Sequence, residues 1–213
     1  MAEPLLPEKL DRYLEGLVPP RDGELARMEA EGKASGFPII GPTCGHFCYL
    51  VARLIAARQV FEMGSGYGYS TAWFARAVAE NGGGRVVHTV WDQDLSRRAQ
   101  AHLLALGLES VVDFRVEEAV QSLQKEPGPL DLIFLDIDKE AYPEALQVIE
   151  SKLRPGGVLL ADNMLLSGDA LDGQNRSARS NAVRTFTERV MQGDRWIASI
   201  VPARDGLLLA YKT

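Results

Sequence analysis

The sequence predicts an α/β fold with a doubly wound, mostly parallel sheet of seven strands and an antiparallel hairpin at its C-terminal edge. Two observations support this prediction. Five strand-like apolar runs alternate with helical stretches, which is typical of a parallel sheet covered on both faces. Two further apolar runs near the C-terminus are joined by a short turn, which favours an antiparallel pair.

The size and composition of the chain fit a single domain of residues 1–213. With 46% apolar residues, the chain can bury one substantial core. The net charge of −6 gives no general attraction to phosphate backbones, so nucleic acid is not an expected partner. Cys44 and Cys48 cannot form a disulfide framework, and the sequence has neither a secretory apolar core nor a membrane-spanning run. We therefore expect a cytoplasmic protein.

Residues 1–40 are expected to form a helical segment that covers a cleft or a dimer interface. Within it, Glu8–Leu17 and Asp22–Gly32 have helical patterns and are separated by a Pro-Pro pair, which interrupts a helix. A third helical pattern begins at Gly45 and ends near Arg58.

The strand-like runs are rich in β-branched and aliphatic residues and are bounded by polar, glycine or proline residues. They are Val60–Met63, Val86–Val90, Val112–Val116, Leu130–Leu135 and Val158–Ala161. The helical stretches between them include Ser70–Glu80, Leu95–Leu106 and Tyr142–Leu153. The hairpin combines Trp196–Val201 with Leu207–Lys212, and the polar stretch Ser167–Ser180 is expected to be a mobile loop over the site.

Three glycines, Gly64, Gly66 and Gly68, lie between the first strand and its helix, where doubly wound sheets bind ligands. Glycine permits positive φ and lets backbone N–H groups approach a ligand. The spacing is one residue shorter than the Gly-x-Gly-x-x-Gly pattern that holds a pyrophosphate, and Glu62 precedes it. A carboxylate here would repel a pyrophosphate but attract the ammonium and sulfonium of S-adenosylmethionine (SAM). The loop therefore favours SAM over NAD, although three glycines can also form a plain tight turn.

A second acidic position supports a nucleoside ligand. Asp92 follows the second strand, where a carboxylate can accept hydrogen bonds from both hydroxyls of an adenosine ribose. Asp94 is the alternative for this role. Ser70 lies at the start of the helix that follows the glycine loop.

Four segments occur in a fixed order along the chain. They are Glu-Met-Gly-Ser-Gly-Tyr-Gly-Tyr-Ser at 62–70, Asp-Leu-Ile-Phe-Leu-Asp-Ile-Asp-Lys at 131–139, Gly-Gly-Val-Leu-Leu-Ala-Asp-Asn-Met-Leu at 156–165 and Asp-Gly-Leu-Leu-Leu-Ala-Tyr-Lys at 205–212. Together they resemble the family of caffeoyl-CoA and catechol O-methyltransferases, from about Ile40 to the end of the chain. The resemblance implies a Rossmann-like, class I SAM-dependent methyltransferase that forms a homodimer.

The resemblance also implies a divalent cation, Mg²⁺ or else Ca²⁺ or Mn²⁺, held by Asp136, Asp162 and Asn163. The residues agree with this, because neighbouring strand ends would bring hard oxygen donors together and leave positions for two adjacent substrate oxygens. In the family, a lysine at the position of Lys139 removes the proton from the hydroxyl that is methylated, which is plausible chemistry for a desolvated amine. Alone, each residue could be a solvated strand end or a surface charge. Asp138 is a candidate for supporting the ligands.

The residues expected to contact SAM are Ile40, Glu62, Gly64, Ser65, Gly66, Ser70, Asp92, Ala119 and Asp136. Ile40 and Ala119 rest on the resemblance alone, at the methionine end and the adenine of the cofactor respectively. The family often has Gly-Asp before that alanine, whereas this chain has Glu117-Glu118, so Glu118 is an alternative contact.

The favoured function is a SAM- and metal-dependent O-methyltransferase that modifies a hydroxyl of a catechol-like small molecule. One alternative keeps this chemistry and takes 5-hydroxyuridine of tRNA as the acceptor, which the acidic composition disfavours. A nicotinamide-dependent oxidoreductase is opposed by Glu62 and the glycine spacing, and a non-catalytic SAM-binding protein is opposed by Lys139. A zinc site at Cys44, His46 and Cys48 lacks a fourth ligand nearby.

Overall fold

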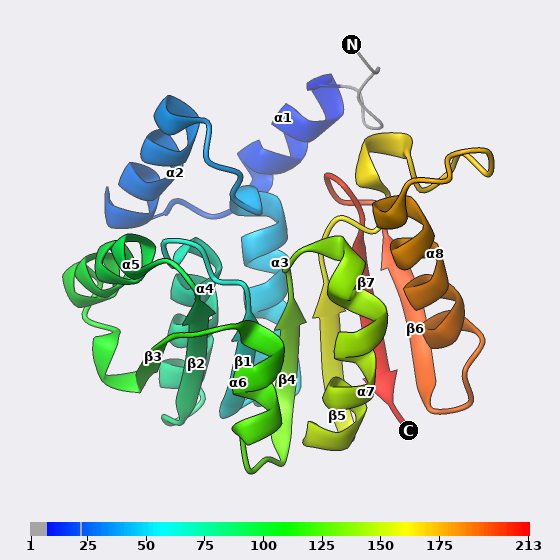
Figure 1. Cartoon of the computed structure of the whole chain (residues 1–213). Coiled ribbons are helices and arrows are strands. Elements are labelled where there is room, and N and C mark those ends of the chain that lie inside the picture. The colour runs from blue at the N-terminus through cyan, green and yellow to red at the C-terminus, as the bar shows by residue number, and fades with distance from the viewer. Residues whose placement is uncertain (1–7, 22) are drawn as a thin grey trace.

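The computed structural model describes residues 8–21 and 23–213. Within these residues one sheet contains β1 (Gln59–Met63), β2 (Arg85–Val90), β3 (Val112–Val116), β4 (Leu130–Leu135), β5 (Leu153–Ala161), β6 (Trp196–Val201) and β7 (Leu207–Lys212). Their order is β3-β2-β1-β4-β5-β7-β6 (Figure 1). The pairs among β1 to β5 are parallel, and β7 is antiparallel to both β5 and β6. The predicted fold class is confirmed.

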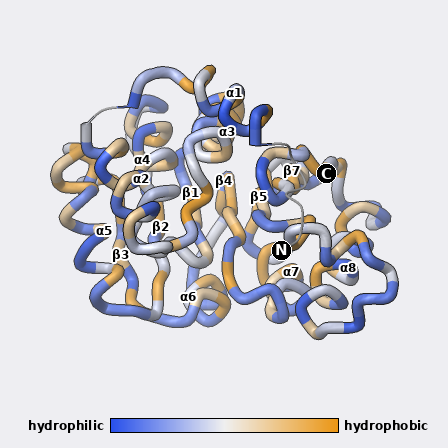
Figure 2. The backbone as a smooth tube through the Cα atoms, turned by 90° about the horizontal axis from the view of Figure 1, so that it is seen from above, coloured by the Kyte–Doolittle hydropathy of each residue, from blue (hydrophilic) through white to orange (hydrophobic). Residues whose placement is uncertain are grey.

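Helices cover both faces of this sheet. In the described residues they are α1 (Glu8–Leu17), α2 (Gly23–Ser35), α3 (Gly41–Leu54), α4 (Tyr69–Glu80), α5 (Gln93–Ala105), α6 (Ala119–Lys125), α7 (Tyr142–Lys152) and α8 (Ala178–Met191), with short 3₁₀ turns η1 (Glu109–Val111), η2 (Lys139–Ala141) and η3 (Leu166–Gly168). α3 and α4 lie on one side of the sheet, and α6, α7 and α8 lie on the other (Figure 2). None of the helices in the described chain is long and apolar enough to cross a bilayer.

Each face buries its own apolar core. On the α3–α4 side, the rings of Phe74 and Phe134 lie 5.5 Å apart between centroids. On the α7–α8 side, Tyr142 packs edge-on against Phe186 at 5.2 Å. Because both faces of the central strands are buried, these strands are continuous apolar runs in the sequence.

Several helices differ from the sequence prediction. α3 begins at Gly41 rather than Gly45, because Pro42 occupies the first turn, where a missing N–H costs no helical hydrogen bond. The short helix α6 and the helix α8 were not predicted. The Ser177 hydroxyl accepts a hydrogen bond from the Ser180 amide at 3.2 Å and caps α8, so the predicted loop ends at Ser177.

The N-terminal helices pack unequally on this core. α2 lies against the glycine loop and α5, since the Tyr67 hydroxyl donates to the Met28 carbonyl at 2.9 Å and His102 lies 2.6 Å from Glu24. α1 has no fully buried residue. Residues 1–7 of the predicted N-terminal segment, and Asp22 at the predicted start of its second helix, lie outside the described residues.

Candidate active site

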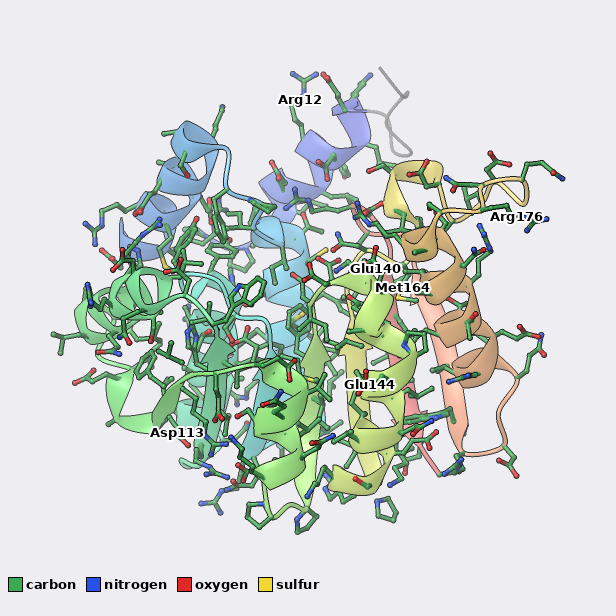
Figure 3. All side chains as sticks on the ribbon, viewed as in Figure 1. Arg12, Asp113, Glu140, Glu144, Met164 and Arg176 are labelled. Carbon is green, nitrogen blue, oxygen red and sulfur yellow. The ribbon has the colours of Figure 1, made fainter. Side chains whose placement is uncertain are left out.

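A cavity of about 1080 Å³ opens at the carboxyl ends of β1, β4 and β5. The residues predicted for the site that line it are Ile40, Gly64, Ser65, Gly66, Ser70, Ala119, Asp136, Lys139, Asp162 and Asn163. Glu140 and Met164, labelled in Figure 3, follow β4 and β5 and mark this end of the sheet. Asp205, the first residue of the fourth sequence segment, also lines the cavity, so residues of all four segments meet at one edge of the sheet.

The glycine loop passes close to the end of β4. Gly64 has φ +84°, and a Cβ atom there would overlap the carbonyl oxygen of Asp136. Gly68 has φ +91° and would press a Cβ against Ala99 of α5. Only glycine satisfies both the left-handed conformation and the close approach, so the loop keeps bare backbone along the cavity.

Glu62 lies beneath this loop and does not line the cavity. Its carboxylate is fully buried and accepts a hydrogen bond from the Thr71 hydroxyl at 2.5 Å. The same hydroxyl lies 3.0 Å from Nδ1 of His88, while Oε1 of Glu62 has no partner among the described residues. Burial raises the pKa of Glu62 to about 7, and burial lowers the pKa of His88 to about 3.

Asp92 also stays outside the cavity lining. One of its oxygens accepts hydrogen bonds from the amides of Asp94 and Leu95, at 2.7 and 2.9 Å, and caps α5. The neighbouring Trp91 is 77% exposed and lines the cavity. Glu118, which precedes Ala119, likewise caps α6 through both carboxylate oxygens.

Asp136, Asp162 and Asn163 meet where β4 and β5 end. The register pairs Leu135 with Ala161, so each aspartate immediately follows a paired residue. Asp162 is buried, and burial together with the nearby carboxylate of Asp136 raises its pKa. Among the residues that the structure describes, no three His, Cys, Asp or Glu side chains are grouped to hold a metal ion. The predicted ligand set differs from such a group because it combines two carboxylates with one amide.

Lys139 lies beside these carboxylates at the edge of the cavity. Its side chain is nearly buried, and its Nζ donates to Oδ1 of Asp136 at 2.7 Å and to the Tyr142 hydroxyl at 2.9 Å. Burial, followed by the charge of Asp136, raises the pKa of Tyr142 well above its ordinary value, so this hydroxyl stays protonated. A nearly buried amine thus contacts one of the carboxylates that line the cavity.

Three residues at this end of the cavity were not predicted for the site. Tyr142 contacts Lys139. Its place three residues after Lys139, at the start of a predicted helix, was the one sequence feature that could have indicated this contact. Arg204 in the β6–β7 turn lines the cavity and donates to the Ile39 carbonyl at 2.8 Å, a long-range contact with no local signal. Arg179, at the first turn of α8, lines the same cavity.

The two cysteines lie on the buried face of α3, in the hydrophobic core. Both are free of disulfide bonds and buried. Burial raises the pKa of Cys44 to about 12, which keeps this thiol protonated and unreactive.

The sequence is similar to those of known O-methyltransferases over most of its length. A family model described as O-methyltransferase matches residues 23–213. The catechol O-methyltransferase of Niastella koreensis is 32% identical over 214 residues, which cover 95% of this chain and 96% of that protein. The catechol O-methyltransferase of Mycobacterium tuberculosis is also 32% identical, over 84% of this chain and 82% of that protein.

Solved structures with the same fold cover nearly the whole chain. The O-methyltransferase from Bacillus cereus in complex with SAH has a TM-score of 0.87 and 28% identity, and covers 96% of this chain and 97% of that one. The O-methyltransferase TomG from Streptomyces achromogenes, involved in tomaymycin synthesis and solved in complex with SAM, has a TM-score of 0.86 and 28% identity. It covers 96% of both chains.

Proposed function

Since the chain belongs to the O-methyltransferase family, we propose that it transfers the methyl group of SAM to one hydroxyl of a catechol-like small molecule, with a divalent cation beside that hydroxyl. The observation that carries this proposal is the cluster of Lys139, Asp136 and Asp162 in the cavity that the glycine loop also lines. One cavity thus offers a site for the methyl donor and a site for the acceptor.

We assign the glycine-loop end of the cavity to SAM. The relatives solved with SAH and with SAM support this assignment. SAM supplies a methyl group on a sulfonium, which is already a good leaving group. Gly64, Ser65 and Gly66 line this end of the cavity, and Asp92 keeps one carboxylate oxygen beyond its helix cap for the ribose. We assign Glu62 an indirect part, because it supports the loop from below.

The donor chemistry at the other end fits a hard divalent cation. Asp136 and Asp162 are held close enough for the charge of Asp136 to raise the pKa of Asp162. A cation between them would remove this repulsion between the two carboxylates. Carboxylate and amide oxygens are ligands that Mg²⁺, Ca²⁺ and Mn²⁺ accept, so Asn163 completes a suitable set. A cation held there would favour the ionised form of an acceptor hydroxyl.

Lys139 is our candidate for the base. Its Nζ lies within hydrogen-bonding distance of Asp136, so an acceptor hydroxyl beside that carboxylate would also be near the amine. The proton passes from the hydroxyl to Nζ, and the oxygen then attacks the methyl carbon in line. Much of the remaining acceleration would come from holding acceptor and donor in this geometry.

We also propose a homodimer of single-domain, cytoplasmic subunits in which α1 and α2 contribute to the cleft. Asp11 of α1 and Phe37, which follows α2, line the cavity, which supports a covering role for residues 1–40. The edge hairpin exposes Ile197 and Tyr211, 68% and 45% accessible, opposite each other in the β6–β7 register. An exposed apolar pair on an edge hairpin fits a second copy of the chain.

The proposal is tested by methyl transfer from labelled SAM to catechols and to bulk tRNA. We expect catechol methylation that stops with EDTA and returns with added Mg²⁺, since the acceptor hydroxyl needs the cation. Asp162→Asn should weaken the response to Mg²⁺ more than it weakens SAM binding. Turnover that survives metal removal would contradict the assigned roles of Asp136, Asp162 and Asn163. If only tRNA were methylated, tRNA rather than a catechol would be the acceptor.

A further inference from the structure

The Tyr142 hydroxyl lies directly behind Lys139, outside the cavity lining. It accepts a hydrogen bond from Nζ of Lys139 at 2.9 Å. It also lies within hydrogen-bonding distance of two backbone carbonyls, 3.1 Å from that of Leu135 and 3.0 Å from that of Asp162. These carbonyls belong to the end of β4 and to the residue after β5. One hydroxyl therefore ties the lysine to both strands that carry the proposed cation ligands.

The direction of these hydrogen bonds is fixed by chemistry. A carbonyl oxygen can only accept, so the single proton of the Tyr142 hydroxyl is donated to the carbonyls of Leu135 and Asp162. Towards Lys139 the same hydroxyl can then only accept. The carboxylate of Asp136, with Oδ1 at 2.7 Å from Nζ, also accepts. Both protein partners of the amine thus take hydrogens from it.

A neutral amine has two N–H groups and one lone pair. With one N–H donated to Asp136 and one to Tyr142, the lone pair of Lys139 occupies the remaining direction. Lys139 lines the cavity and Tyr142 does not, so the free direction is on the cavity side. Without the two carbonyls, the tyrosine proton could instead bond to this lone pair and block it.

We propose that Tyr142 is a positioning residue that orients the amine of Lys139, so that the lone pair of the amine faces the acceptor hydroxyl. This inference rests on the proposed role of Lys139 as the base. The acceptor O–H proton moves to Nζ, an oxygen lone pair forms the bond to the methyl carbon, and the electrons of the breaking C–S bond go to sulfur. Tyr142 gains and loses no proton.

Local structure keeps Tyr142 in this place. Lys139 begins the 3₁₀ turn η2 and Tyr142 begins α7 directly after it, and residues three apart in a 3₁₀ turn share one edge. The tyrosine ring is fully buried and packs edge-on against Phe186 of α8 at 5.2 Å. The hydroxyl therefore cannot turn away from Nζ without disturbing the packing of α7 on α8.

Tyr142→Phe tests this role by removing one oxygen atom. With Mg²⁺ present, we expect kcat for catechol to fall about 10-fold or more, because a misplaced base loses part of its contribution, while the KM for SAM stays the same. With nitrocatechol, whose hydroxyl is far more acidic and needs little help from a base, the loss should be several-fold smaller. A merely structural effect would lower both rates equally.

The controls separate this inference from the proposed function. Lys139→Ala should show the same dependence on the acceptor, whereas Tyr49→Phe, which removes a hydroxyl bonded to Glu80 outside the cavity lining, should change neither rate. Rates are expressed per SAH-binding site, so loss of folded protein is not counted as loss of turnover. If Tyr142→Phe does not fold, a ring-fluorinated tyrosine at this position keeps the hydroxyl as a weaker acceptor and should give a smaller loss with the same selectivity.

Equal losses with catechol and nitrocatechol, or no loss, would overturn the role of Tyr142 while leaving the proposed function intact. An unchanged rate in Lys139→Ala would instead remove the base on which the inference rests. Failure of the parent enzyme to methylate either catechol would contradict the proposed acceptor class.

Discussion

Glu62 lies beneath the candidate site and outside the lining of its cavity. Its carboxylate is fully buried under the glycine loop and accepts a hydrogen bond from the Thr71 hydroxyl. Ionising such a group in the protein interior is costly, which is why its pKa rises to about 7 from 4.5. Ionising Glu62 in the folded protein therefore lowers the free energy of unfolding.

A pH-dependent stability follows from this raised pKa. The folded state binds the Glu62 proton more tightly than the unfolded state, so stability is greatest below the unfolded pKa of 4.5 and falls as pH rises towards 7. The full loss is about 3 kcal/mol at 1.36 kcal/mol per pKa unit. Glu62→Gln removes this titration. Between about pH 5 and about pH 8, the free energy of unfolding of the parent should therefore fall by roughly 2 kcal/mol relative to that of the variant.

Urea unfolding of both chains at the two pH values, without cofactor, provides the measurement. His88, whose pKa is lowered to about 3 by burial, stabilises the fold less as pH falls below its ordinary value, but this contribution is common to both chains. A constant difference between parent and variant across the range would mean that Glu62 is not the titrating group.

The sequence shows which residues gather at the site but not which way each side chain faces. Asp136, Lys139 and Asp162 could be predicted because strand ends of a parallel sheet meet at one edge. Glu62 also ends a strand, yet its side chain turns under the loop to reach Thr71. Arg204 could not be predicted, since its contact with Ile39 joins segments far apart in the chain.

At the scale of elements, the glycine loop and the end of β4 are built as one unit. Gly64→Ala would force a Cβ into the carbonyl of Asp136 and would also strain φ +84°. Gly82→Ala is a matched control, because it has φ +92° but open space around the added Cβ. We expect about 1 kcal/mol of destabilisation from the control and at least twice that from Gly64→Ala.

Thermal unfolding and SAH binding of the two variants measure this difference. Gly64→Ala should also weaken SAH binding, because the loop must shift away from β4, whereas Gly82→Ala should leave it unchanged. Equal effects of the two changes on stability would indicate that only backbone strain matters, and that the loop does not depend on the close approach to β4.

Strands were easier to predict than helices for a physical reason. A buried parallel strand is a mostly apolar run with clear limits, so β4 begins and ends at the predicted residues. Helix limits depend on capping and on packing partners. The helical pattern of α3 was recognised only from Gly45, although the helix begins at Gly41 with Pro42 in its first turn. The polar surface of α8 hid the buried Val183 and Phe186.

At the scale of the whole molecule, the cavity and the exposed apolar pair of the edge hairpin lie apart. The carboxyl ends of the parallel strands carry the cavity, which begins beyond Ala161. The exposed pair Ile197 and Tyr211 lies further back along the sheet, because Tyr211 pairs with Val158 near the middle of β5. A homodimer formed through this hairpin face would leave the cavity open to substrates.

Ile197→Glu tests that dimer. In a two-fold interface the same residue occurs twice, so one substitution buries two charges and should convert a particle of twice 23.4 kDa into a monomer. Leu104→Glu is the matched control, because Leu104 is 63% exposed on α5, over the β2–β3 side of the sheet. Sedimentation equilibrium distinguishes the two masses.

A parent chain that is already monomeric, or a dimer that tolerates Ile197→Glu, would exclude this face as the interface. Because the hairpin face lies away from the glycine loop, SAH binding should survive in the monomer.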